Sequence, residues 1–153
     1  MSESTAKGTI SMILISACLA GINCKYNAGS NTVEELRQMY LEGKCTAVCP
    51  EQLGGLSTPR PCAEIIQGRV INTAGEDVTA AYQKGSQKAL QLALDAGCTE
   101  AVLKARSPSC GVGEIYDGTF THTRVEGNGI FADMCIQHGI HCMSEIEYKE
   151  KKR

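Results

Sequence analysis

The stretch ISMILISACLAG, residues 10–21, decides the fold of this chain. Its first part, Ile10 to Ser16, is rich in β-forming residues and almost entirely apolar at its centre. A short apolar run that ends in small residues and glycine is typical of a strand buried on both faces of a parallel sheet. The stretch therefore predicts a central strand and, directly after it, a loop that carries Cys18.

Apolar runs and helical patterns alternate along the rest of the chain, which is typical of βαβ units. We expect further strands at 46–48, 101–103 and 140–143. The helices expected between them run over 32–43, 77–97 and 130–139, and each ends at a glycine. Thr32 and Glu35 predict a capping box for the first helix, and Asp77 predicts a cap for the second. The expected buried stripe of the long helix comprises Val78, Ala81, Tyr82, Ala89, Leu90, Ala93 and Leu94.

Two further extended segments, 64–72 and 114–123, carry turn residues at Gly68 and at Asp117-Gly118. They predict hairpins or flaps attached to the sheet. Residues 1–8 and 147–153 are expected to be a loose start and a solvated tail. Because the 153 residues contain no repeat or linker, we expect one α/β domain over 1–153 with its core over about 10–147.

The charge balance points to no macromolecular partner. Lys plus Arg number 15 and Asp plus Glu number 17, so the net charge is −2. This gives no electrostatic reason to expect bulk nucleic acid or an anionic membrane as a partner. No run approaches the roughly 20 apolar residues that span a bilayer, and no secretory signal precedes the cysteines. We therefore expect a cytoplasmic protein whose thiols stay reduced.

Nine cysteines are the outstanding feature of the composition. Three of them, Cys18, Cys49 and Cys110, lie in loops of small residues, glycine or proline that follow predicted strands. Because ligands of open α/β sheets bind beyond the carboxyl ends of the strands, these three thiols are expected to converge. Such loops bring backbone N–H groups close to a bound object, so a phosphate or an anionic cluster would suit the place.

Three convergent thiolates could bind either a zinc ion or an iron–sulfur cluster. Structural zinc usually shows close C-x2-C pairs, and this chain has none, so zinc is the weaker interpretation. Thiolates from distant loops can instead bind a 4Fe-4S cluster through three irons and leave the fourth iron open. Cys24, in a turn-like segment near Cys18, is undecided. The cysteines expected to be only small buried residues are Cys45, Cys62, Cys98, Cys135 and Cys142.

Polar residues that a reaction would need stand near these cysteines. Glu51 follows Cys49 by two residues and could act as acid or base, or merely cap a helix. Ser107 and Ser109 flank a proline before Cys110 and could bind substrate or only form a turn. The cations that bracket the end of the third strand, Lys104 and Arg106, could contact a substrate phosphate or pair with acidic neighbours. No dinucleotide fingerprint, P-loop or H-E-x-x-H motif occurs.

Four segments together resemble the thiouracil desulfidases, a small bacterial family long labelled a domain of unknown function. They are SACLAGINCKYNAGS at 16–30, CPEQLGGLSTPRPCAEI at 49–65, GEDVT at 75–79 and LKARSPSCGVGEIYDGTF at 103–120. The resemblance runs from about residue 10 to residue 147 and is closest to the short, stand-alone members. Cys62 stands where a proline is expected in the family, and Cys24 is common in short members.

The resemblance implies a Rossmann-like α/β domain with a 4Fe-4S cluster on Cys18, Cys49 and Cys110. It implies a non-redox reaction that converts 4-thiouracil, 2-thiouracil or 4-thio-UMP to uracil or UMP and releases sulfide. By motif position, Glu51 would activate water and move protons, and Ser107 would position the substrate. Cys24 remains an alternative ligand, or a disulfide partner of Cys18 in protein handled in air.

Two other readings of the residues stay open. In the first, Cys49 or Cys110 is a metal-free nucleophile activated by a helix N-terminus, with Glu51 as its base. In the second, the cysteines form a metal or cluster module that senses oxygen or has a structural role and performs no catalysis. A desulfidase of this charge would act on a free base or nucleotide rather than on bulk RNA, which needs a basic face.

Overall fold

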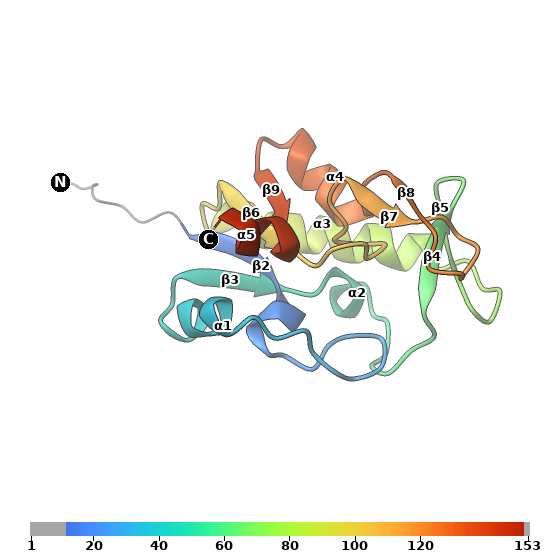
Figure 1. Ribbon diagram of the computed structural model, residues 1–153, viewed down its shortest axis with the longest axis horizontal. Helices are drawn as coiled ribbons and strands as arrows, with labels where there is room; N and C mark the ends of the chain where they lie inside the picture. The colour runs from blue at the N-terminus through green and yellow to red at the C-terminus, as the bar shows by residue number, and fades with distance from the viewer. Residues whose placement is uncertain (1–11, 152–153) are drawn as a thin grey trace.

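The computed structural model describes residues 12–151 of the chain. At its centre is a four-stranded sheet in the order β3-β2-β6-β9, in which all neighbouring strands are parallel (Figure 1). The strands are β2 (Ile13–Ser16), β3 (Cys45–Val48), β6 (Glu100–Leu103) and β9 (His141–Ser144). The predicted α/β architecture with a parallel sheet is confirmed, and the strand ends differ from the prediction by at most one residue where both lie among the described residues. Residues 10 and 11 of the first predicted strand, and the expected loose start at 1–8, lie outside the described residues.

Helices cover both faces of the sheet. On one face, α3 (Thr79–Asp95) and α4 (Ile130–Gln137) pack with Leu14 in a core that includes Ala93 and Phe131. On the other face, α1 (Glu34–Leu41) packs against Ile15, and α5 (Glu145–Lys151) adds Tyr148 to the same core. Consecutive residues of β2 therefore serve opposite cores, since side chains alternate along a strand. This explains why the strand is apolar up to its last residue, Ser16.

Two antiparallel hairpins lie side by side at one end of the molecule (Figure 1). The first pairs β4 (Ala63–Ile66) with β5 (Arg69–Asn72) around a turn at Gly68, as predicted. The second pairs β7 (Glu114–Tyr116) with β8 (Arg124–Glu126) through a loop that contains Asp117-Gly118, so the hairpin is confirmed but its second strand begins beyond the predicted end at 123. Glu64 Oε1 accepts the N–H groups of Gly118 at 3.0 Å and Phe120 at 3.1 Å in this long connection. These bonds hold the connecting loop, residues 117–123, against β4.

The presence of α1 and α3 was predicted correctly, but the residues at which they begin were predicted less well. The capping box is wrong, because α1 begins at Glu34 and Thr32 Oγ1 instead lies 3.0 Å from Ser30 Oγ. Asp77 does cap α3, since its Oδ1 accepts the Thr79 N–H at 2.9 Å, although the residue directly before the helix is Val78. The stripe of α3 is buried largely as predicted, but Leu94 is 42% exposed.

Three short helices were not predicted from the sequence. Two of them follow strands directly, η1 (Ala17–Ala20) after β2 and α2 (Pro50–Leu53) after β3. The third, α5, replaces the expected solvated tail as far as residue 151. Its Tyr148 hydroxyl bonds Glu35 and approaches Met39, so contacts with α1 order this charged segment. Among residues 12–151, no helix combines the length and the apolar character needed to cross a membrane.

Candidate active site

A cavity of about 320 Å³ lies at the carboxyl ends of β2, β3 and β6. In the sheet, the chain moves outward from β2 to β3 and then returns to the other side of β2 as β6. Such a change of direction leaves a crevice between the loops that follow the neighbouring strands, and α/β proteins bind ligands there. Cys18, Cys49 and Cys110 all line this cavity. The structure thus brings the three thiols together, while their role as ligands stays a prediction.

Each of the three thiols has a polar neighbour. Asn31 Nδ2 donates to Cys18 Sγ at 3.6 Å, and Ser109 Oγ lies 3.6 Å from Cys110 Sγ. Cys49 Sγ donates to the carbonyl oxygen of Cys24 at 3.8 Å. Burial raises the pKa of Cys18 and raises the pKa of Cys110 to about 12, whereas the neighbouring Cys24 thiol lowers the pKa of Cys49 by hydrogen bonding. The three sulfurs therefore differ in how readily they lose a proton.

The donor set suits an iron–sulfur cluster better than a single ion. All nine cysteines lie among the described residues, and none of them is in a disulfide. Within residues 12–151, no three His, Cys, Asp or Glu side chains are grouped so that they could hold one metal ion. Three soft thiol donors spaced around a cavity, with hydrogen bonds to their sulfurs, have the chemistry and the room for a larger cluster. Cys24 lines the same cavity and remains the alternative donor.

Close helix packing places Glu51 at the cavity. Glu51 lies in the first turn of α2, whose first residue is Pro50. A Cβ atom on Gly85 of α3 would overlap the carbonyl oxygen of Pro50, so only glycine permits this approach of the two helices. The short helix is thereby fixed against the long one, with Glu51 facing the thiols.

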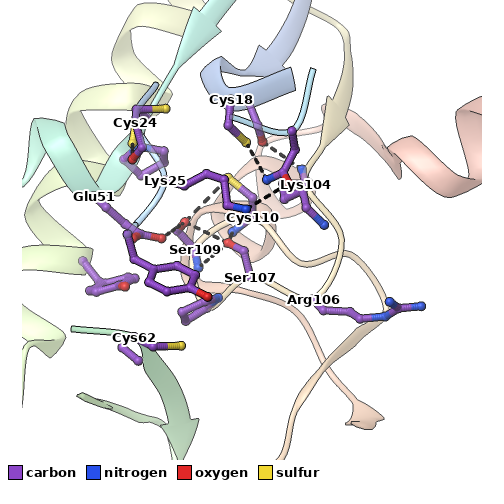
Figure 2. A pocket seen from close by; sticks show the side chains of 18 of the residues that line it. Cys18, Cys24, Lys25, Glu51, Cys62, Lys104, Arg106, Ser107, Ser109 and Cys110 are labelled. Carbon is purple, nitrogen blue, oxygen red and sulfur yellow. Dashed lines mark hydrogen bonds between the residues drawn. The ribbon is translucent and has the colours of Figure 1, made fainter. Parts of the chain in front are cut away.

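Glu51 takes part in a compact hydrogen-bonded group (Figure 2). Its Oε2 accepts the Ser109 hydroxyl at 2.9 Å, and its Oε1 accepts Arg60 Nε at 2.9 Å and Nη2 at 2.7 Å. Ser107 Oγ accepts the backbone N–H groups of Ser109 at 3.1 Å and Cys110 at 2.7 Å. Ser107 therefore fixes the loop that carries Cys110, and its own hydrogen is left for Ser109 or for a bound molecule.

The two cations predicted to bind substrate are both paired with carboxylates. Lys104 Nζ lies 3.0 Å from Glu145 Oε2, and Arg106 Nε lies 3.1 Å from Glu114 Oε1. Both residues line the cavity, but Figure 2 shows Arg106 pointing away from the Glu51 and Ser109 group. The alternative that they pair with acidic neighbours is thus observed, and a role in substrate binding stays a prediction.

Several cavity residues were missed by sequence reasoning. Arg60 had a signal, since it lies between two prolines in TPRP, close after Glu51. Tyr82 was assigned only to the buried stripe of α3, yet it lines the cavity, and burial raises the pKa of its phenol. Tyr116 and His122 form the wall on the hairpin side, with ring centroids 5.7 Å apart at an interplanar angle of 77°. Nothing in the local sequence predicts that these two rings meet.

Comparison with known proteins agrees with the motifs and the cavity. Residues 13–147 match the 2-thiouracil desulfurase family. The chain is 41% identical over 149 residues to YbbK of Bacillus subtilis (strain 168), covering 91% of this chain and 99% of that protein. It is also similar to the solved structure of TudS, a 4Fe-4S-dependent thiouracil desulfidase, with a TM-score of 0.85 and 40% identity. That match covers 92% of this chain and 94% of TudS. The chain therefore belongs to the 2-thiouracil desulfurase family.

Proposed function

We propose that this protein removes sulfur from a thiolated uracil and releases it as sulfide. The substrates proposed are 4-thiouracil, 2-thiouracil or 4-thio-UMP, and the products are uracil or UMP. The observation that carries the proposal is the meeting of Cys18, Cys49 and Cys110 with the Glu51 carboxylate in one cavity. In the reaction one water replaces the thiocarbonyl sulfur, which leaves as hydrogen sulfide, so no electron donor or acceptor is needed.

The same three cysteines would hold a 4Fe-4S cluster, as the printed description of TudS implies for that relative. When bound, the cluster supplies a Lewis-acidic iron that prefers sulfur as a ligand. Because burial raises the pKa of Cys18 and of Cys110, both thiols must release protons when they become ligands. Cys24, which lines the same cavity, is the alternative ligand.

The protein's own residues would supply the proton transfers. Glu51 Oε2 faces the Ser109 hydroxyl and would accept a proton from the attacking water and later return it to the departing sulfur. Ser107 would donate its remaining hydrogen to the substrate while it fixes the loop of Cys110. Water and substrate would meet in a cavity of about 320 Å³, which is at the lower end of the range for small-molecule sites.

The size of the cavity and the net charge of the chain favour a small substrate, and the unpaired thiols favour a reducing compartment. A net charge of −2 and a cavity of this size favour a free base or nucleotide over bulk RNA. Nine unpaired thiols are typical of the cytoplasm, where cysteines stay reduced.

The test is to purify and reconstitute the protein without oxygen and to measure iron, acid-labile sulfide and turnover. We expect about four iron and four sulfide per chain. We also expect stoichiometric sulfide and uracil from 4-thiouracil or 2-thiouracil, or UMP from 4-thio-UMP. Bound iron without turnover of any of the three compounds would support the sensor module instead.

A metal-free cysteine nucleophile is the second candidate. It is favoured by Cys49, which directly precedes α2 and whose pKa the Cys24 thiol lowers by hydrogen bonding. In that case the iron-free protein would release sulfide, and alkylation of Cys49 alone would stop turnover. Under the proposed function, iron-free protein releases none.

A further inference from the structure

We propose that Arg60 is a positioning residue that fixes the Glu51 carboxylate, so that its Oε2 faces the thiols of the cavity. This inference rests on the proposed function, because it specifies how Glu51 would be held for that reaction. The side chains of Arg60 and Glu51 are 6% and 13% exposed, and their closest N–O distance is 2.7 Å. A nearly buried ion pair therefore lines the same cavity as the thiols.

All five N–H groups of the guanidinium have acceptors. Nε and Nη2 donate to Glu51 Oε1, and Nη2 also donates to the carbonyl oxygen of Cys24 at 2.9 Å. Nη1 donates to the carbonyl oxygen of Ser57 at 3.1 Å and to Thr58 Oγ1 at 2.9 Å. Because the fork is rigid and every donor is used, the guanidinium has one orientation. A lysine has three donors on a flexible stem and cannot make this set of bonds.

The two oxygens of Glu51 consequently have different roles. Oε1 accepts two N–H groups from a permanently charged partner and is held by it. Oε2 accepts the Ser109 hydroxyl, whose oxygen also lies 3.6 Å from Cys110 Sγ. The oxygen that Arg60 does not contact is therefore the one on the side of the thiols. Tyr82 is the other buried neighbour of this carboxylate.

Arg60 also links Glu51 to the cysteine loops. The carbonyl oxygen of Cys24 accepts from Arg60 Nη2 and lies 3.8 Å from Cys49 Sγ. One guanidinium thus joins the start of α2, the segment around Cys24 and the turn at residues 57–60. This linkage sets the distance between the carboxylate and the thiols, which an ion pair serving stability alone would not require.

The test compares Arg60→Gln and Arg60→Lys with the parent, Glu51→Gln and a matched control, Arg69→Gln. Arg69 also pairs with a carboxylate, Asp77, but its side chain is 58% exposed and lies outside the cavity. Iron, labile sulfide and the unfolding temperature are measured together with kcat and KM for thiouracil. We expect both Arg60 variants to keep their iron and to lose about 10²-fold in kcat with little change in KM. Arg69→Gln is expected to match the parent.

Chemical rescue separates positioning from a structural role. Millimolar guanidinium should raise the kcat of Arg60→Ala several-fold and leave the parent and Glu51→Gln unchanged. Loss of iron or of folding in both Arg60→Gln and Arg60→Lys would overturn the inference. The ion pair between Arg60 and Glu51 would then have a structural role. Parental kcat in Arg60→Gln, beside an inactive Glu51→Gln, would overturn this inference alone. An inactive parent with a full complement of iron would instead refute the proposed function.

Discussion

The cysteines at the two ends of the sheet share a side chain but have different surroundings. Cys45 begins β3 and Cys98 precedes β6, so both lie at the amino ends of strands and inside the two cores. Cys18 and Cys110 follow β2 and β6 and line the cavity. The comparison teaches that the end of the strand at which a cysteine lies, rather than burial alone, separates packing cysteines from candidate ligands.

Burial and hydrogen bonding act on the thiols at both ends. Burial raises the pKa of Cys45 to about 11 and also raises that of Cys98, where a hydrogen bond with the Thr46 side chain partly opposes the effect. At the carboxyl end, hydrogen bonds with side chains, Asn31 for Cys18 and Ser16 and Ser109 for Cys110, likewise partly oppose the effect of burial. What differs between the two ends is the cavity that Cys18 and Cys110 line, and the following predictions test this difference.

The largest effect is expected from the three candidate ligands. Replacing Cys18, Cys49 or Cys110 with serine should abolish cluster binding and sulfide release, because each removes one of three thiolates. Iron and labile sulfide per chain measure the outcome. Cys62→Ser is the matched control, since Cys62 lines the same cavity but is not a proposed ligand. Iron loss in Cys24→Ser, with retention in one of the three, would reassign the ligand set.

The second effect tests the carboxylate beside the thiols. Glu51→Gln keeps the shape of the side chain but removes its capacity to take up a proton. We expect normal iron content and a fall in the rate of sulfide release of about 10³-fold, within the range for general acid–base catalysis. A rate close to that of the parent would exclude Glu51 from the mechanism. Its contacts with Arg60 and Ser109 would then have only a structural role.

A smaller loss is expected from Ser107, whose hydroxyl fixes the backbone before Cys110. Ser107→Ala leaves two backbone N–H groups without their acceptor, so the loop should shift slightly and misplace the substrate. The expected loss of kcat is about 10²-fold with iron retained. Ser107→Thr, which keeps the hydroxyl, should recover most of the rate. Equal rates in the alanine and threonine variants would show that the hydroxyl is dispensable.

Substitution of cysteines in the packed core is expected to leave iron content unchanged. Cys135 is 0% exposed on α4, and Cys135→Ala should lower the free energy of unfolding by about 1 kcal/mol. Iron content should equal that of the parent. Chemical denaturation gives the stability, with the half-buried Cys142→Ala as the control that should lose less. Iron loss in either variant would contradict the division between the two ends of the sheet.

Much of this arrangement was predictable because local signals and the parallel sheet agree. Short apolar runs and helical patterns identified the strands and the long helix, and the strand-end rule placed Cys18, Cys49 and Cys110 together. The failures have two causes. The segment after Ser144 is ordered by a contact between distant segments, Tyr148 against α1, whereas the Thr32 hydroxyl lies by the neighbouring Ser30 hydroxyl and does not cap that helix.

The surroundings of the candidate site were predicted only in part because of contacts between distant segments. Glu51 and Ser109 were both selected, but their 2.9 Å contact spans 58 positions in the sequence and becomes visible only in the folded chain. Arg60 was missed because two of its four acceptors, Glu51 Oε1 and the carbonyl oxygen of Cys24, are brought to it only by the tertiary structure. The charges of Lys104 and Arg106 were visible, whereas their pairing with Glu145 and Glu114 was not.

The two hairpins have a consequence for how this family can diversify. The cavity wall with Tyr116 and His122 belongs to a hairpin outside the parallel sheet, and Glu64 of the other hairpin holds its connecting loop. Thiol positions and wall composition therefore depend on separate parts of the chain. A substitution in residues 117–123 alters the cavity wall without touching the strand ends that carry the cysteines. Selection for a new thiolated substrate could therefore act on this loop and leave the three thiols in place.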